Sequence, residues 1–270
     1  MMKKRKANSF LCLDIFKKIL PKHKNSQTTI FIILAVLILG AIAGTSYLQQ
    51  SKKTEFLSLK ENKDKIDRAR NLALVCIENS VSTSLDKIGF QGGYFEKPKY
   101  YYKDEFTENF LTYYYHQGEI SYPSKAVVEK ELSKAINEEL GLCNELKSEE
   151  DNFELKFGKP RTITKINEKD ISFDIIYPVI ISINGESTTI FRDHKINRIS
   201  ALNNILETAS FMTESRKESP ETDCISCLAK MTEEKNLYME VYNFDEDTTI
   251  VGIYENYTQD QQSLIFLNKF

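Results

Sequence analysis

The residues with the clearest chemical potential in this chain are its five cysteines. Cys224 and Cys227 are separated by two residues, and such a pair at the start of a helix can exchange thiol and disulfide, because the helix N-terminus lowers a thiol pKa. Cys76 and Cys143 each fall on the apolar face of a predicted helix, which indicates burial. Cys12 lies in a basic N-terminal tail and is expected to stay reduced.

Three kinds of chemistry are open to the other four cysteines. An even number in an oxidising compartment predicts two structural disulfides. Three pairings are possible, and the pairing of Cys76 with Cys143, which leaves Cys224 with Cys227, is the one we favour at this stage. The Cys76–Cys143 bond would close a loop of about 68 residues and stabilise by about 4 kcal/mol in the chain-entropy model. Redox exchange at Cys224 and Cys227 is less favoured, because the pair follows a helix and not the first strand of a βαβ unit. A zinc site is also less favoured, since such sites usually show two close pairs.

No other catalytic or cofactor-binding motif stands in the sequence: P-loop, G-x-G-x-x-G, G-x-S-x-G and H-E-x-x-H are all missing. We therefore expect a protein without cofactor, metal or enzymatic activity. Tyrosines are abundant, and Tyr94, Tyr101, Tyr113 and Tyr115 are candidates for a surface that binds sugar or peptide, because tyrosine offers a flat face and a hydroxyl. The alternative is that these rings fill the core of a domain that has no tryptophan.

A sequon marks one candidate modification site. Asn256-Tyr257-Thr258 has the form N-x-T and falls in a polar turn predicted between two strands. Glycosylation at Asn256 and an unused site are both open at this stage, because a three-residue pattern often arises by chance.

Charge is distributed unevenly along the chain. Residues 1–27 hold eight Lys or Arg and one acid, Asp14, whereas the whole chain has a net charge of −3. The rest of the chain therefore holds 28 basic and 38 acidic residues. This acidic balance argues against a nucleic acid partner.

An uncharged apolar run of 21 residues, 28–48, predicts a transmembrane helix, because a helix of this length spans about 30 Å. The positive-inside rule then places the basic tail 1–27 in the cytoplasm and residues 49–270 outside the cell membrane. We expect an uncleaved signal-anchor in the lipid bilayer, a single-pass topology, and a polar stalk over residues 49–65.

The periodicity of the outer part predicts an α+β fold with a largely antiparallel sheet. Residues 66–146 form a helical and hairpin region, and residues 152–270 form an α+β domain. The clearest strand is 171–183, where every odd position is apolar. Pro178 within it predicts an edge strand or a bend. The other predicted strands and helices are strands at 153–157, 188–191, 237–242, 248–254 and 263–267 and helices starting near residues 66, 124, 199 and 222.

Two resemblances bear on topology. The junction from Lys24 to Phe31 resembles the signal of archaeal type IV pilin-like proteins, although Ser26 stands where glycine is usual and Phe31 where glutamate is usual. The segments around Cys76, Gly89–Tyr94, Cys143 and Cys224–Cys227 resemble uncharacterised single-pass membrane proteins of small-genome archaea of the DPANN type. The second resemblance implies the topology and an archaeal origin, and no activity.

The sequence thus predicts a membrane-anchored cell-envelope protein that binds a protein or carbohydrate partner or has a structural role. One alternative is a pilin-like subunit of a filament or secretion machine, whose mature N-terminus would be Gln27. The other is a thiol-disulfide oxidoreductase that uses Cys224 and Cys227.

Overall fold

The computed structural model describes Ile38 and residues 62–103, 109–143, 153–183, 185–218, 224–256 and 261–270. Asn62–Phe270 forms one compact unit, and its fold is α+β, as predicted. The predicted tail, the predicted span except Ile38, which is helical, and the stalk up to residue 61 lie outside the described residues. Within the part of the chain that the structure describes, no helix has both the length and the apolar character needed to cross a bilayer.

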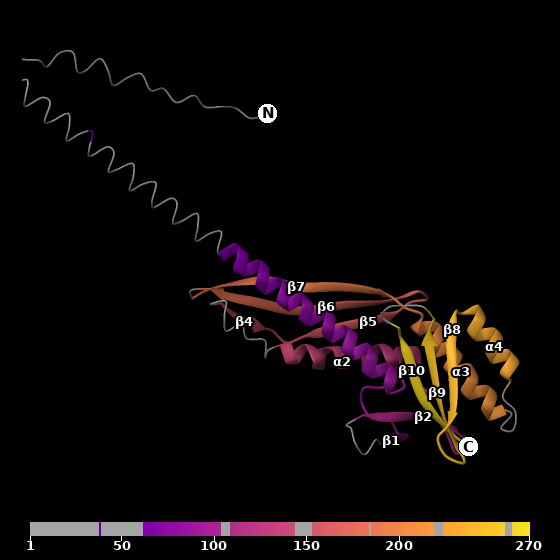
Figure 1. Cartoon of the computed structure of the whole chain (residues 1–270). Coiled ribbons are helices and arrows are strands. Elements are labelled where there is room, and N and C mark those ends of the chain that lie inside the picture. Colours follow the sequence, from indigo (N-terminus) through magenta and orange to yellow (C-terminus); the bar gives the residue numbers. More distant parts are fainter. Residues whose placement is uncertain are drawn as a thin grey trace, which may run out of the picture. The chain divides into compact units, whose positions relative to one another are not determined.

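Two helices pack on one face of a four-stranded sheet (Figure 1). The first, here called the N-terminal helix, is helical throughout 62–90. The second, α2 (Lys125–Leu142), begins after Ser124, whose side chain caps it by accepting from the Val127 N–H. Its buried apolar residues follow helical spacing, as the sequence predicts: Val128, Leu132, Ala135, Ile136 and Leu140. The sheet consists of β4 (Phe153–Phe157), β5 (Arg161–Ile166), β6 (Asp170–Ile183) and β7 (Glu186–Ile199).

Strand β6 is the centre of this sheet. Its odd-numbered side chains are buried from Ile171 to Ile183, which confirms the predicted strand. The prediction of an edge position because of Pro178 is wrong, since β4 and β5 pair with one edge of β6 and β7 with the other. Pro178 is tolerated because it lies between the segments that pair with β4 and with β5, where the β6–β7 register also shifts. The predicted bend therefore corresponds to this irregularity.

A second, six-stranded sheet combines strands from both ends of the compact unit. Its strand order is β1-β2-β10-β9-β8, with β3 paired to β2, and every pairing is antiparallel except the parallel pair β2–β10. Helices α3 (Leu202–Glu218) and α4 (Ile225–Glu234) lie beside its β8–β10 part (Figure 1). The strands are β1 (Tyr101–Lys103), β2 (Phe110–His116), β3 (Glu119–Ile120), β8 (Leu237–Asn243), β9 (Thr248–Glu255) and β10 (Ser263–Lys269).

Three boundaries differ from those predicted. Strand β7 has 14 residues, whereas a strand was predicted over 188–191 only, because its polar side chains hide the pairing with β6. Ile199, predicted to start a helix, is instead the last residue of β7 and is 89% exposed. Helix α4 begins at Ile225 with Cys224 as its N-cap, and the predicted caps at 222 and 223 lie outside the described residues.

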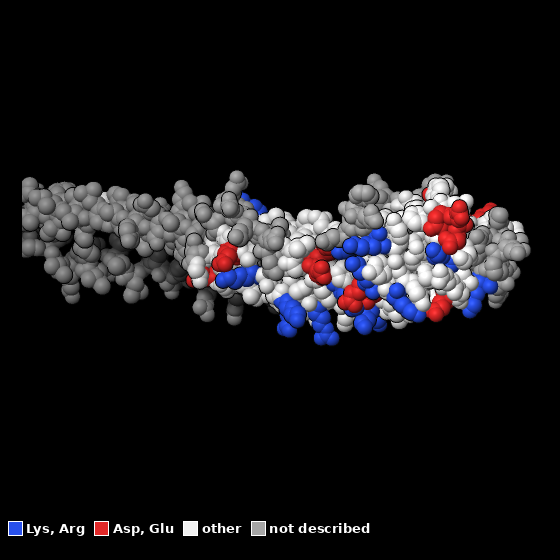
Figure 2. Space-filling model, turned by 90° about the horizontal axis from the view of Figure 1, so that it is seen from below, with Lys and Arg blue, Asp and Glu red and all other residues white. Residues whose placement is uncertain are grey.

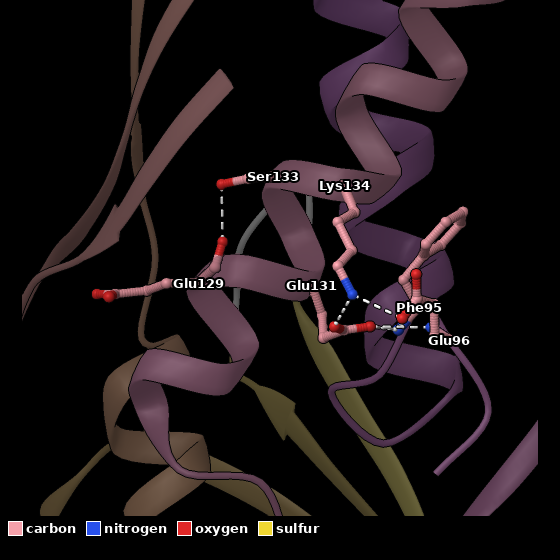
Figure 3. A network of polar contacts seen from close by, with 6 residues as sticks. All are labelled: Phe95, Glu96, Glu129, Glu131, Ser133 and Lys134. Carbon is pink, nitrogen blue, oxygen red and sulfur yellow. Dashed lines mark hydrogen bonds and ion pairs between the residues drawn. The ribbon is translucent and has the colours of Figure 1, made fainter. Parts of the chain in front are cut away.

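A buried carboxylate ties α2 to the turn that follows the N-terminal helix (Figure 3). Glu131 is 6% exposed, and its Oε2 accepts from the N–H groups of Phe95 (3.1 Å) and Glu96 (2.9 Å). Lys134 donates to Glu131 and to the Glu96 carboxylate, at 2.7 Å each. Burial alone would raise the pKa of Glu131, but these hydrogen bonds to the Glu96 N–H and to Lys134 outweigh it, and the pKa lies below its ordinary value.

Candidate functional site

The structure joins Cys76 to Cys143 by a disulfide, as predicted. The sulfur atoms are 2.00 Å apart and the Cα atoms 6.2 Å apart. The bond connects the N-terminal helix to the C-cap of α2, and Cys143 is fully buried in the core between these helices and the four-stranded sheet. Its place in a packed core gives this disulfide a structural role.

The second disulfide, Cys224–Cys227, lies at the start of α4, with its Cα atoms 5.2 Å apart. The sulfurs of Cys76, Cys143, Cys224 and Cys227 are all used in the two disulfides, which favours the disulfide assignment over the zinc alternative. Helix α4 follows α3 and leads into β8, a strand with an antiparallel partner. This is not the βαβ context of thiol-disulfide oxidoreductases, so the bond is best understood as fixing the first turn of α4.

Two of the four candidate tyrosines lie near the turn after the N-terminal helix. The Tyr94 hydroxyl donates to the Ser121 carbonyl, 3.2 Å away, and burial, followed by the Glu131 carboxylate, raises the pKa of Tyr94. Tyr101 is 38% exposed, and its ring meets the edge of Phe110 at a centroid distance of 5.8 Å. Tyr94 thus holds a loop, while Tyr101 remains accessible.

The other two candidates, Tyr113 and Tyr115, alternate in β2 with the buried Tyr114. Tyr114 stacks on Phe266 at 4.1 Å in the core, which is the alternative role considered for these rings. Tyr113 and Tyr115 are half-buried, and Tyr101 pairs with Thr112 and so lies on the opposite face of the sheet from Tyr113. The four candidates therefore do not share one surface, and their role in binding stays a prediction.

Asn256 follows β9 directly and is partly exposed. Its amide lies 3.5 Å from the side-chain oxygen of Asn236, and Tyr257 and Thr258 of the sequon lie outside the described residues. Glycosylation of Asn256 stays a prediction.

An apolar groove of about 430 Å³ opens between α4 and β8. Leu228, Ala229 and Thr232 form its helical wall, and Leu237, Met239 and Val241 line it from β8, with Tyr238 between them bordering it as well. Met212 of α3 also contributes to its lining. Val241 is 44% exposed, so solvent reaches this apolar groove. Grooves of this size and lining are typical of ligand and peptide sites.

The opposite face of β8 carries exposed tyrosines around one carboxylate. Tyr238 and Tyr242 are 54% and 56% exposed, and the Tyr238 hydroxyl donates to Glu240 at 3.1 Å. Hydrogen bonding to Glu240 raises the pKa of both tyrosines. Tyr254 of β9 packs beside Tyr238, with 6.3 Å between the ring centroids. Its ring lies over Gly252, where a Cβ would collide with the Tyr254 hydroxyl.

Sequence reasoning identified β8 as a strand but did not single it out as a site. The available signal was the alternation in LYMEVYN, in which apolar Leu237, Met239 and Val241 alternate with Tyr238, Glu240 and Tyr242. Comparison of the chain with protein-family models, with curated proteins and with solved structures found no match. The geometry of β8 and α4 is therefore the basis for a functional proposal.

Proposed function

We propose that this chain is a membrane-anchored protein of the cell envelope whose outer part acts by binding a protein or carbohydrate partner. The observation that supports this proposal best is the open groove between α4 and β8, since an accessible apolar groove is characteristic of a binding site. The tyrosines on the other face of β8 add hydroxyl groups and flat rings at the same edge of the sheet.

The membrane anchor in this proposal rests on the sequence. The uncharged run 28–48 has the length of a bilayer-spanning helix, and the eight basic residues before it favour a cytoplasmic N-terminus. The two disulfides are consistent with an outer part in an oxidising compartment.

The orientation leads to a first prediction. Protease added to intact cells is expected to digest the part beyond Ser51 and to spare residues 1–27, as detected with tags at the two ends. Lysed cells treated in the same way are the control for protease access to the tail. If the C-terminal tag survives in intact cells, the proposed orientation is wrong.

The groove leads to a second prediction. A photo-reactive amino acid introduced at Met239 of the full chain is expected to form a discrete crosslinked product when native membranes are irradiated, because Met239 lines the groove. The matched control is the same amino acid at Lys156, an exposed position of β4 in the other sheet. Equal crosslinking at both positions, or none at Met239, would contradict a binding role for the groove.

A further inference from the structure

Strand β8 is the outermost strand of its sheet. Among the described residues it pairs only with β9, so its other edge has no partner strand. The hydrogen bonds Phe244 N–H to Thr248 O and Asn256 N–H to Asn236 O show which residues face β9. No register shift interrupts the β8–β9 ladder, so the backbone N–H and C=O groups of the even-numbered residues of β8 bond to β9. The N–H and C=O groups of Leu237, Met239 and Val241 consequently point to the open edge.

The same three residues line the groove, and as alternate residues of one strand they direct their side chains to the same face of the sheet. An extended segment placed antiparallel along this edge would pair its backbone with theirs, and its facing residues would direct their side chains into the groove. The wall formed by α4 would then cover those side chains. Backbone pairing at a strand edge combined with pockets for alternate side chains is the way in which proteins bind peptides by strand addition.

The edge of β8 also lacks the usual protection against pairing. Exposed edge strands are normally blunted by Lys, by Pro or by several charges. Strand β8 has seven residues with neither Lys nor Pro, and Glu240 is its one charged residue. The long edge strand β7 of the other sheet differs, since it carries charged side chains along its length, namely Glu186, Arg192, Asp193, Lys195 and Arg198.

The charge of the residues around this edge distinguishes two possible binding partners, a second copy of the chain and a basic segment of another protein. From Ile225 to Asp247, which covers α4, β8 and the turn into β9, the chain holds six acidic residues and two lysines. Three of the acids, Asp245, Glu246 and Asp247, are exposed in that turn, where Lys269 of β10 lies 3.6 Å from Asp247 and offsets one of the three charges. Figure 2 shows acidic side chains gathered near this end of the sheet. A second copy of the chain would place two acidic edges together, whereas a basic segment would be attracted.

We propose that β8 binds an extended segment of a partner protein as an added strand, and that basic residues alternate with apolar ones in this segment. The apolar side chains enter the groove beside Leu228 and Met239, and the basic ones lie on the opposite face, beside Glu240. This inference rests on the proposed binding function and specifies the class of partner.

The test uses the full chain in detergent and a fluorescent synthetic heptapeptide in which lysine alternates with valine, matched to the length of β8. N-methylation of one alternate set of peptide nitrogens is expected to weaken binding about tenfold or more, and methylation of the other set to leave it within about twofold. If the peptide lies antiparallel to β8, methylation of the valine nitrogens is the change that is expected to weaken binding. Replacing the lysines by glutamate is expected to abolish binding.

Protein variants complete the experiment. V241P removes an N–H at the open edge, where proline is tolerated, and is expected to weaken binding about tenfold or more. Its matched control, V241T, keeps this N–H and the branched side chain and is expected to bind like the parent. The peptides are tested on the unaltered chain, so the result does not depend on whether V241P folds.

Several outcomes would overturn the inference. These are no peptide binding, equal effects of both methylation patterns, preference for the glutamate peptide, or self-association of the chain that V241P abolishes. If the crosslink at Met239 forms while the peptide fails, the groove still binds a partner and only the strand-addition inference is lost. If both fail, the proposed function is lost with it.

Discussion

Replacing Cys76 by serine is expected to lower the free energy of unfolding by about 2–5 kcal/mol. The bond to Cys143 closes a loop with a sequence separation of 67 and connects the half-buried Cys76 of the N-terminal helix to the fully buried Cys143 at the end of α2. Removing it increases the conformational entropy of the unfolded chain. It also leaves the Cys143 thiol in the core, opposite the serine hydroxyl at position 76. The measurement is denaturant unfolding of the full chain in detergent, followed by tyrosine fluorescence because the chain has no tryptophan.

The matched control for this variant is Cys224→Ser. Its bond to Cys227 spans a sequence separation of only 3, so the chain-entropy term is about half as large, near 2 kcal/mol. The Cys76 variant should also leave Cys227 unreactive toward alkylating agents, since the two bonds are independent. A Cys76 variant as stable as the parent, or one in which Cys227 becomes alkylated, would contradict the structural role assigned here.

Local periodicity explains which elements the sequence could predict. Burial of one face produces the alternation in β6 and the i, i+4 spacing in α2, namely Val128, Leu132, Ile136 and Leu140. Such a pattern can be recognised in the sequence without knowing which elements pack against that face. The pairing of Cys76 with Cys143 could be inferred in the same way, because both cysteines continue an apolar stripe on their helices.

The elements that sequence reasoning missed depend on partners distant in the chain. Strand β5 was not predicted, although its Thr162, Thr164 and Ile166 are buried in alternation, because two of these three residues are polar. The parallel pairing of β2 with β10 joins Tyr113 to Leu267, residues that are more than 150 positions apart in the chain. No local pattern indicates such a pairing.

The groove escaped prediction for the same reason. Leu228 in α4 and Met239 in β8 each look like ordinary core residues of short elements, and only the turn between them brings their side chains to one surface. That the second edge of β8 has no partner strand among the described residues is a property of strand order, which the sequence does not show. The sequence shows the acidic residues Asp245, Glu246 and Asp247, but it does not show that they lie beside the edge of β8.

The second large effect is expected at Glu131. Glu131→Ala should destabilise the fold by about 2–4 kcal/mol at neutral pH, because the N–H groups of the half-buried Phe95 and of Glu96 lose their buried acceptor and Lys134 loses one of its two carboxylate partners. The matched control, Glu138→Ala, removes an exposed carboxylate from the same helix and should change stability by less than about 0.5 kcal/mol.

The pH dependence of Glu131→Gln separates charge from hydrogen bonding. The pKa of Glu131 is lowered in the folded state, since the Glu96 N–H and Lys134 overcome the opposing effect of burial. A carboxyl group with a lowered folded pKa contributes stability above its unfolded pKa of about 4.3 and loses it as the pH falls through the folded value. The parent should therefore exceed the Gln variant most at pH 7, and the difference should shrink below about pH 4. A difference that stays constant from pH 7 to pH 3 would assign the effect of Glu131 to shape and hydrogen bonding alone, and would contradict a role for its charge in holding the turn at Phe95 and Glu96.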